Sequence, residues 1–277
     1  MEKIKIGDFV GRKSYNKDIL FRVKSIIDTK AGKIAILTGI IERVEADSII
    51  NDLEKVSEER IQKDLSTIQK RIEGKINQLN KIEENRNKYT ITGKILHLDG
   101  DKKYSEKSYQ YYKKLGLNAI VKNIPEYKQP KVVYNLLKIY QPDILVITGH
   151  DGMIKKNSRY DDLYNYRNSK YFIETVKEAR KYDKETNKRL VIFAGACQSY
   201  FEALICAGAN FASSPGRILI DFIDPLIVAE KIAVTERYKY ITIEDIENEL
   251  RDGKKGVSGI GANGKMYKIT RWNIIVT

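Results

Sequence analysis

The sequence predicts an α/β fold in which a three-layer domain with a mostly parallel sheet follows a small all-β segment and a long amphipathic helix. Three patterns support this. Residues 1–50 alternate between apolar and polar positions, residues 52–86 place apolar side chains every three or four residues, and later apolar runs alternate with amphipathic segments. With 277 residues, of which 42% are hydrophobic and 31% charged, the chain has room for more than one globular domain.

The first segment, residues 1–50, consists of short runs with two-residue alternation, separated by Gly, Asn and Asp. The expected strands are 6–12, 19–27, 33–39 and 41–46. This pattern predicts a small SH3-like β-barrel. Barrels of this kind bind peptides, RNA or neighbouring domains, so the fold alone does not select a function.

The second segment, residues 51–88, is a helical, coiled-coil-like linker. Its apolar residues recur among Lys, Glu and Gln; they are Leu53, Val56, Ile61, Leu65, Ile68, Ile72, Ile76, Leu79 and Ile82. Such a stripe packs either against the next domain or against a second copy of the helix. Both alternatives stay open, and the second would make the protein a homodimer.

The third segment, residues 89–277, alternates apolar strands with helices, which is typical of a parallel sheet covered on both faces. The expected strands are 92–100, 118–121, 143–149, 189–195 and 210–214, and the expected helices are 105–115, 130–140, 171–184, 198–208 and 225–235. In such a sheet the site lies beyond the carboxyl ends of the strands. The polar, Tyr-rich loop 153–170 is either an ordinary exposed loop or a self-cleavage or substrate-gating segment.

The composition limits the metal sites, cofactors and partners that can be expected. The chain holds two His and two Cys, namely His97, His150, Cys197 and Cys206, without a C-x-x-C or H-x-x-x-H pair, so neither a metal site nor a cofactor is expected. The net charge is +13, but basic and acidic residues are interspersed, which favours a solvated surface over a nucleic-acid partner. The sequence has no apolar run of ~20 residues and no apolar signal core, and it predicts a cytoplasmic protein without a membrane partner.

His150 and Cys197 each follow one of the two most apolar expected strands, 143–149 and 189–195. If these strands are neighbours, the two residues share one crevice. A thiolate is the nucleophile of cysteine peptidases, and an imidazole can take its proton and give one to the leaving amine. We therefore predict a His150–Cys197 dyad that forms a thioester acyl-enzyme. A helix expected to begin near Gln198 would lower the pKa of the thiol.

Small residues around the dyad would let a substrate backbone approach. Gly149 and Gly152 flank His150, and Gly195 and Ala196 precede Cys197. The oxyanion hole would combine the backbone amide of Cys197 with that of Asp151 or of Gly152.

On these residues the chain resembles the caspase-like (clan CD) cysteine peptidases, in which His precedes Cys at a separation of ~50 residues. It resembles the YabG family of sporulation-specific cysteine peptidases more closely, over nearly its whole length. The matching segments are 95–101, 148–152, 195–199, 208–215 and 224–230. One departure from the broader clan is Asp151, which stands between His150 and the following glycine.

The resemblance implies a caspase-like domain at 89–277 and the processing of spore coat and cortex-associated proteins near basic residues, in the mother cell of a sporulating bacterium or at the spore coat. A basic substrate side chain needs a buried acid in its pocket. Asp99 and Asp101, in the loop after the first core strand, are the candidates, with Asp221 and Asp224 as weaker ones. Asp-Gly-Asp is also ordinary turn chemistry.

Several alternative interpretations compete with the cysteine-peptidase prediction. The chain could be a non-enzymatic coat scaffold or a nucleic-acid-binding protein that uses its N-terminal barrel. Gly259–Gly264 matches G-x-G-x-x-G but does not open a helix, so phosphate binding is not expected there. His97, inside a strand pattern, is expected to be structural, and Cys206 is expected in the core.

Overall fold

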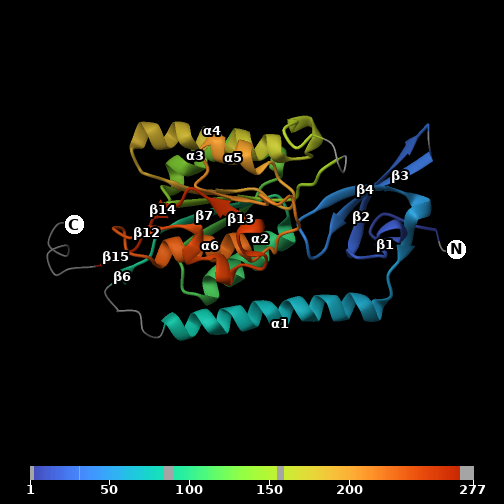
Figure 1. Cartoon of the computed structure of the whole chain (residues 1–277), viewed down its shortest axis with the longest axis horizontal. Coiled ribbons are helices and arrows are strands. Elements are labelled where there is room, and N and C mark those ends of the chain that lie inside the picture. The colour runs from blue at the N-terminus through green and yellow to red at the C-terminus, as the bar shows by residue number, and fades with distance from the viewer. Residues whose placement is uncertain (1–2, 31, 84–89, 155–158, 269–277) are drawn as a thin grey trace.

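The computed structural model describes residues 3–30, 32–83, 90–154 and 159–268. A small sheet of N-terminal strands lies at one end of the molecule and a larger α/β body at the other, and one long helix runs alongside both (Figure 1). The fold is therefore mixed α/β with a largely parallel central sheet, as the sequence predicts. Within the described residues, no helix is long and apolar enough to cross a membrane.

The central sheet has six strands in the order β13-β11-β10-β9-β7-β8. All neighbouring pairs are parallel except β13 with β11. The strands are β7 (Ile95–Asp99), β8 (Ala119–Asn123), β9 (Ile144–Thr148), β10 (Val191–Ala194), β11 (Phe211–Ser213) and β13 (Val257–Gly259). Both β9 and β10 are buried along their whole length, which is why their residues are apolar except for Thr148 at the end of β9.

Helices cover both faces of this sheet. They are α2 (Lys102–Lys114), α3 (Gln129–Tyr140), α4 (Ser169–Thr186), α5 (Phe201–Ala207) and α6 (Asp224–Val234). Successive strand residues point to opposite faces: Ile144 packs with α2 and α6, whereas Leu145 packs with α3 and α4. The result is the predicted arrangement of three layers (Figure 1).

The N-terminal strands form a five-stranded antiparallel sheet in the order β4-β3-β2-β1-β5. They are β1 (Phe9–Arg12), β2 (Phe21–Thr29), β3 (Gly32–Gly39), β4 (Glu45–Ile49) and β5 (Leu53–Lys55). Among the described residues β4 and β5 are edges that do not pair with each other, so the structure has no closed barrel and does not confirm the SH3-like one. The last strand of this sheet, β5, also lies beyond residue 50, the predicted end of the segment.

Short pairs of strands complete the α/β body: β6 (Thr90–Ile91) with β15 (Tyr267–Lys268), and β12 (Tyr240–Ile241) with β14 (Ala262–Asn263). The glycine-rich segment 259–264 therefore contributes strand residues and does not open a helix. This agrees with the expectation that the segment does not open a helix.

The long helix α1 (Glu58–Glu83) packs on its own chain. Ile72 and Ile76 are buried and belong to the same core cluster as Tyr111 of α2. The sequence predicts that the apolar stripe packs either on the next domain or on a second copy of the helix. The contacts of Ile72 and Ile76 are with the next domain.

We predict that Ile76→Ala lowers the free energy of unfolding by about 2–3 kcal/mol, because it removes buried methylene groups and leaves a cavity. Urea unfolding followed by circular dichroism measures the loss. Asn77→Ala, at the exposed neighbouring position, is the matched control and should change stability by less than ~0.5 kcal/mol. A loss that depends on protein concentration would instead indicate a seam between two copies.

Candidate active site

His150 and Cys197 occupy equivalent positions after neighbouring parallel strands. In the β9–β10 register Ile147 pairs with Ala194, and His150 and Cys197 each lie the same number of residues beyond that pair. Their loops leave the same edge of the sheet. The register therefore brings both residues to the carboxyl-end edge of the sheet, where the sequence predicts the site.

The His150 ring is almost completely buried, at 5% exposure, and meets the Tyr104 ring edge-on with 5.8 Å between centroids. Its Nε2 atom is buried without a hydrogen-bond partner among the described residues. Burial lowers the pKa of His150, although Asp101 and Asp99 act in the opposite direction. The imidazole is thus held neutral, which is the form that can accept a proton.

The Cys197 thiol is fully buried. Its sulfur accepts a hydrogen bond from the Ile220 amide at 3.3 Å and lies 3.7 Å from the Ile220 carbonyl oxygen, to which it donates. Burial raises the pKa of Cys197 to about 12, and the contact with Ile220 offsets only part of this shift. In this state the thiol is protonated.

The expectation that a helix N-terminus lowers the pKa of Cys197 is wrong. Helix α5 begins only at Phe201, and the residues after Cys197 form a turn in which Gln198 takes a left-handed conformation with φ of 55°. The amide of Gln198 donates to the Ile218 carbonyl oxygen and to Ser214 Oγ, both at 3.1 Å. The turn fixes the thiol against Ile220 instead of at the end of a helix.

Asp151 ties the two loops together. Its fully buried carboxylate accepts hydrogen bonds from the Ser199 hydroxyl at 2.8 Å and from the Ser169 hydroxyl at the start of α4. Ser199 Oγ in turn accepts from the Ala196 amide at 2.9 Å. The residue that departs from the broader clan pattern thus links the loop of His150 to the loop of Cys197.

Glu126 supports His150 from the other side. Its Oε1 atom accepts a hydrogen bond from the His150 amide at 2.8 Å, and burial raises the pKa of this carboxyl to about 7. Gly100 and Gly149 leave room for it, because a Cβ at either position would lie within 2.3 Å of its oxygen. Sequence reasoning missed Glu126, since nothing in its own segment marks it.

The two predicted acids in the loop after β7 differ in their surroundings. Asp99 is fully buried, and its carboxylate accepts hydrogen bonds from Thr148 Oγ1 at 2.9 Å and the Asp101 amide at 2.8 Å. Asp101 caps α2 by accepting from the amides of Lys103 and Tyr104. Asp101 thus has the helix-capping role that its position in a turn predicts, whereas the carboxylate of Asp99 is buried in the protein interior.

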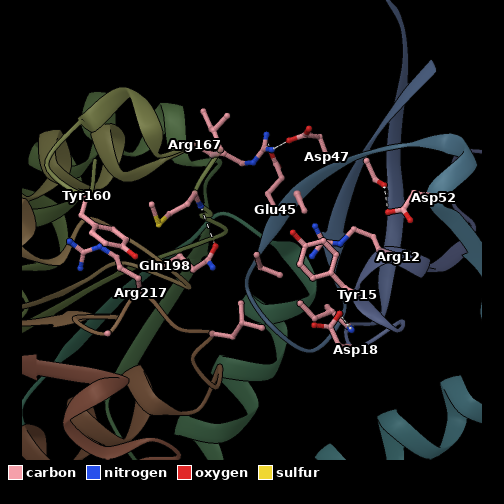
Figure 2. Close-up of a pocket in the computed structure, with 18 residues that line it drawn as sticks. Arg12, Tyr15, Asp18, Glu45, Asp47, Asp52, Tyr160, Arg167, Gln198 and Arg217 are labelled. Atoms are coloured by element: carbon pink, nitrogen blue, oxygen red, sulfur yellow. Dashed lines mark hydrogen bonds and ion pairs between the residues drawn. The ribbon is translucent and has the colours of Figure 1, made fainter. Parts of the chain in front are cut away.

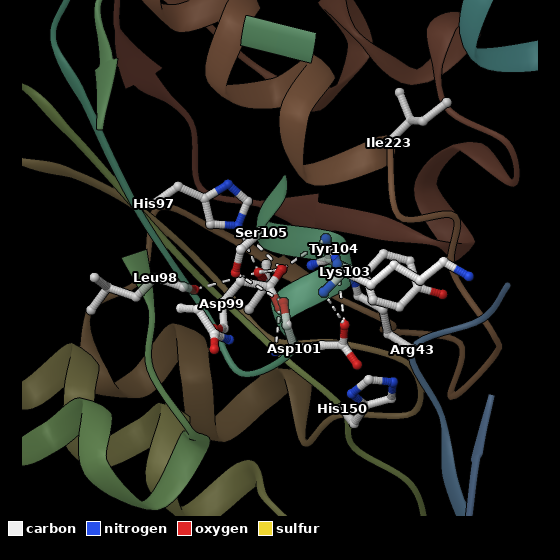
Figure 3. A network of polar contacts seen from close by, with 12 residues as sticks. Arg43, His97, Leu98, Asp99, Asp101, Lys103, Tyr104, Ser105, His150 and Ile223 are labelled. Atoms are coloured by element: carbon white, nitrogen blue, oxygen red, sulfur yellow. Dashed lines mark hydrogen bonds and ion pairs between the residues drawn. The ribbon is translucent and has the colours of Figure 1, made fainter. Parts of the chain in front are cut away.

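Arg43, from the segment between β3 and β4, is the partner of Asp99. The Arg43 side chain is fully buried, and its Nη2 lies 3.0 Å from Asp99 Oδ2 (Figure 3). Its guanidinium carbon lies 4.9 Å from the centre of the Tyr104 ring. Sequence reasoning did not single out Arg43, because it lies in the N-terminal sheet and the pair forms only in the folded protein.

The remaining predicted residues have other places. His97 is buried, bonds Thr148 Oγ1 at 2.7 Å through Nε2, and has a pKa well below its usual value because of burial, which fits a structural role. Asp224 is buried and accepts from the Arg251 and Asp221 amides. Cys206 is exposed, so its expected place in the core is wrong: α5 buries Leu204, and Cys206 lies on the opposite face of that helix.

Two cavities open between the N-terminal sheet and the α/β body. One, of about 440 Å³, is lined by His150, Tyr104 and Glu126 together with Gly7, Phe9 and other residues of the small sheet. The second, of about 480 Å³, lies between Arg12 and Asp47 of the small sheet and Gln198 and Arg217 of the α/β body (Figure 2). Glu45 lines both, and Cys197 lines neither.

Comparison with known proteins places the chain among the peptidases. The family described as YabG peptidase U57 matches residues 5–270. The sporulation-specific protease YabG of Bacillus subtilis (strain 168) is 41% identical over 281 aligned residues, which cover 95% of this chain and 96% of that protein. No solved structure matches.

The chain therefore belongs to the YabG peptidase family, and it is a peptidase that acts on protein substrates. This confirms the family that the sequence motifs indicate.

We predict that the stability contributed by Glu126 falls as the pH rises. Because the folded protein raises the pKa of this carboxyl from 4.5 to about 7, the folded state holds an extra proton between these values. The benefit is complete below pH 4.5 and lost above about pH 7. Relative to Glu126→Gln, the wild type should lose about 2–3 kcal/mol between pH 4.5 and 8, measured by urea unfolding.

Glu126→Gln keeps an oxygen for the His150 amide, so the hydrogen bond survives while the titration does not. The exposed Glu174→Gln is the matched control and should follow the wild-type pH profile. An identical profile for wild type and Glu126→Gln would contradict the assigned pKa.

Proposed function

We propose that the chain is a cysteine endopeptidase with a caspase-like α/β domain, in which His150 and Cys197 form the catalytic dyad. The observation that carries the proposal is the equivalent placement of these residues after β9 and β10, within a chain of a peptidase family. The other pair of His and Cys lacks this geometry, since His97 lies inside β7 and Cys206 is exposed on α5.

In the proposed reaction the Cys197 thiol gives its proton to His150 Nε2, the buried atom that has no other partner among the described residues. The thiolate attacks the substrate carbonyl carbon, and the resulting oxyanion accepts hydrogen bonds from the amides of Cys197 and of Asp151 or Gly152. His150 then protonates the leaving amine, and a thioester remains. Water, deprotonated by His150, hydrolyses the thioester and restores the thiol.

Of the two candidate amides beside His150, Asp151 is the better placed donor. The Gly152 amide already donates to Asp151 Oδ1 at 2.9 Å. The Asp151 amide donates to a main-chain carbonyl, that of Arg43, at 3.2 Å. A substrate carbonyl can take the same place.

Cleavage next to basic residues fits Asp99 better than Asp101. A buried carboxylate next to an aromatic face is a site for a guanidinium, and Asp99 with Tyr104 already holds one. The carboxylate of Asp101 is occupied by the N-terminal amides of α2.

The name of the Bacillus subtilis relative supports a role in sporulation. We propose that this chain acts in the mother cell or at the spore coat, on coat and cortex-associated proteins, and on its own chain. Pairing of two copies through the 52–86 helix stays a prediction. A non-enzymatic scaffold is the alternative, for which the N-terminal sheet would be the binding surface.

We predict that Cys197→Ala and His150→Ala each abolish peptide-bond cleavage, with a loss of at least about 10³-fold in kcat/KM, because the thiol and its proton acceptor act as one unit. Hydrolysis of an arginine-containing chromogenic peptide by the full chain measures this. Cys206→Ala is the matched control and should keep wild-type activity. Undiminished cleavage by Cys197→Ala would remove Cys197 as the nucleophile and with it the cysteine-peptidase proposal, whereas a wild type without any cleavage would favour the scaffold.

We predict that Asp99→Asn lowers kcat/KM for peptides with arginine before the cleaved bond by a hundredfold or more, because the substrate cation loses its buried partner. Asp101→Asn should cost less than about tenfold, through weaker capping of α2. Rates for peptides with Arg and with Leu at this position, measured in both variants, separate the candidates. A larger selective loss in Asp101→Asn would reverse the assignment.

A further inference from the structure

The segment Ile40–Glu45 of the N-terminal sheet lies along the carboxyl ends of β7 and β9, where a substrate of the proposed peptidase has to bind. Val44 forms a parallel bridge with Asp151, the residue after His150. The Asp151 amide donates to the Arg43 carbonyl oxygen at 3.2 Å, and the Glu45 amide donates to the Asp151 carbonyl oxygen at 3.0 Å. The main chain on both sides of Val44 is thus held as an added strand holds a sheet edge.

The approach of the two backbones is close. A Cβ on Gly152 would lie 2.5 Å from the Glu45 carbonyl oxygen, so only glycine fits there. Sequence reasoning assigned this glycine to the approach of a substrate backbone. In the structure the approaching backbone is the protein's own.

The side chain of Arg43 enters the pocket of Asp99. It is 0% exposed, and its ion pair with Asp99 is buried on both sides. Its Nε and Nη1 atoms have no hydrogen-bond partner among the described residues. An apolar side chain would cover the strand ends at a lower desolvation cost. A guanidinium is needed there only if the pocket is built for one.

Two contacts hold the ends of the segment. Tyr104 donates through its hydroxyl to the Ile40 carbonyl oxygen at 2.9 Å. At the other end Arg167 forms ion pairs with Glu45 and Asp47, at the rim of the second cavity (Figure 2). The segment is therefore anchored to the α/β body on both sides of Arg43.

We propose that Ile40–Glu45 is a tethered, substrate-like inhibitor whose Arg43 fills the pocket for the basic substrate residue. This rests on the proposed function, since it takes His150, Cys197 and Asp99 as the site that is blocked. Cys197 fits the same state: it shares a core cluster with Val44 and keeps its proton. A substrate must displace the segment. Its apparent affinity is therefore the intrinsic affinity multiplied by the fraction of molecules in which the segment is displaced.

The test compares the full-length wild type with Arg43→Gln, which empties the pocket of its cation. We expect Arg43→Gln to hydrolyse an arginine-containing chromogenic peptide at least about tenfold faster at low substrate concentration, because the internal competitor is gone. Lys33→Gln, which removes one positive charge from an exposed position of β3, is the matched control and should behave as the wild type.

Alkylation provides a readout that does not need turnover. Iodoacetamide should modify Cys197 slowly in the wild type and faster in Arg43→Gln, while exposed Cys206 reacts equally in both, as mass spectrometry of the peptides reports. If Arg43→Gln does not fold, Arg167→Gln provides the test, because it releases the anchor at Glu45 and leaves Asp99 paired with Arg43. We expect this variant to hydrolyse the peptide severalfold faster than the wild type.

Folded variants that show neither a faster rate nor faster Cys197 alkylation than the wild type would overturn the inhibitor proposal. That result leaves the peptidase proposal standing if Cys197→Ala is inactive, so the two failures are distinguishable. Self-cleavage after Arg43 would give a fragment that begins at Val44 in the wild type and not in Cys197→Ala. Such a fragment would support the proposal, because this cleavage requires Arg43 in the pocket.

Discussion

The buried carboxylate of Asp151 is the constraint on which the site depends. It accepts hydrogen bonds from Ser199 in the Cys197 loop, Ser169 at the start of α4 and the Asn168 amide. Its own backbone pairs with the segment around Val44. One residue thus fixes the loop of His150 relative to the loop of Cys197, to a covering helix and to the N-terminal sheet. A buried carboxylate is tolerable because several donors surround it, and removing one of them would weaken this compensation.

The same edge of the sheet collects an unusual set of buried polar groups. Arg43, Asp99 and His150 are all at most 5% exposed, whereas the faces of the sheet are packed with aliphatic and aromatic side chains. A stable core does not need these groups, and each of them carries a desolvation cost. Their concentration where the strands end fits the proposed site, which has to handle charge and protons.

The strands, and the positions of His150 and Cys197 directly after two of them, could be predicted from sequence because they depend on local patterns. β9 and β10 are buried on both faces, so their apolar runs are continuous, and His150 and Cys197 stand out as the first reactive side chains after them. The partners could not be predicted in the same way. Arg43 meets Asp99 and Glu126 meets the His150 amide only after distant segments pack, and no periodicity records such pairs.

The pKa of Cys197 shows a further limit of sequence reasoning. A Cys before a helical pattern predicts a lowered pKa, yet the helix begins at Phe201 and the thiol faces Ile220, which is far away in the sequence. The sign of the shift is decided by burial under the N-terminal sheet, since Cys197 and Val44 share one cluster. Local sequence marks Cys197 as the candidate nucleophile, whereas tertiary packing decides whether its thiol is ionised.

In the proposed inhibited state the segment Ile40–Glu45 occupies the substrate pocket, and its Val44 is part of the cluster that buries the thiol. Displacing this segment exposes Cys197 to water, and a thiol that regains solvent titrates closer to its ordinary pKa of about 8.5. The same movement frees the Asp151 amide and the Asp99 carboxylate for a substrate. Access for the substrate and ionisation of the nucleophile are then thermodynamically linked. A peptide that competes for the Asp99 pocket would itself shift the population towards the reactive thiol.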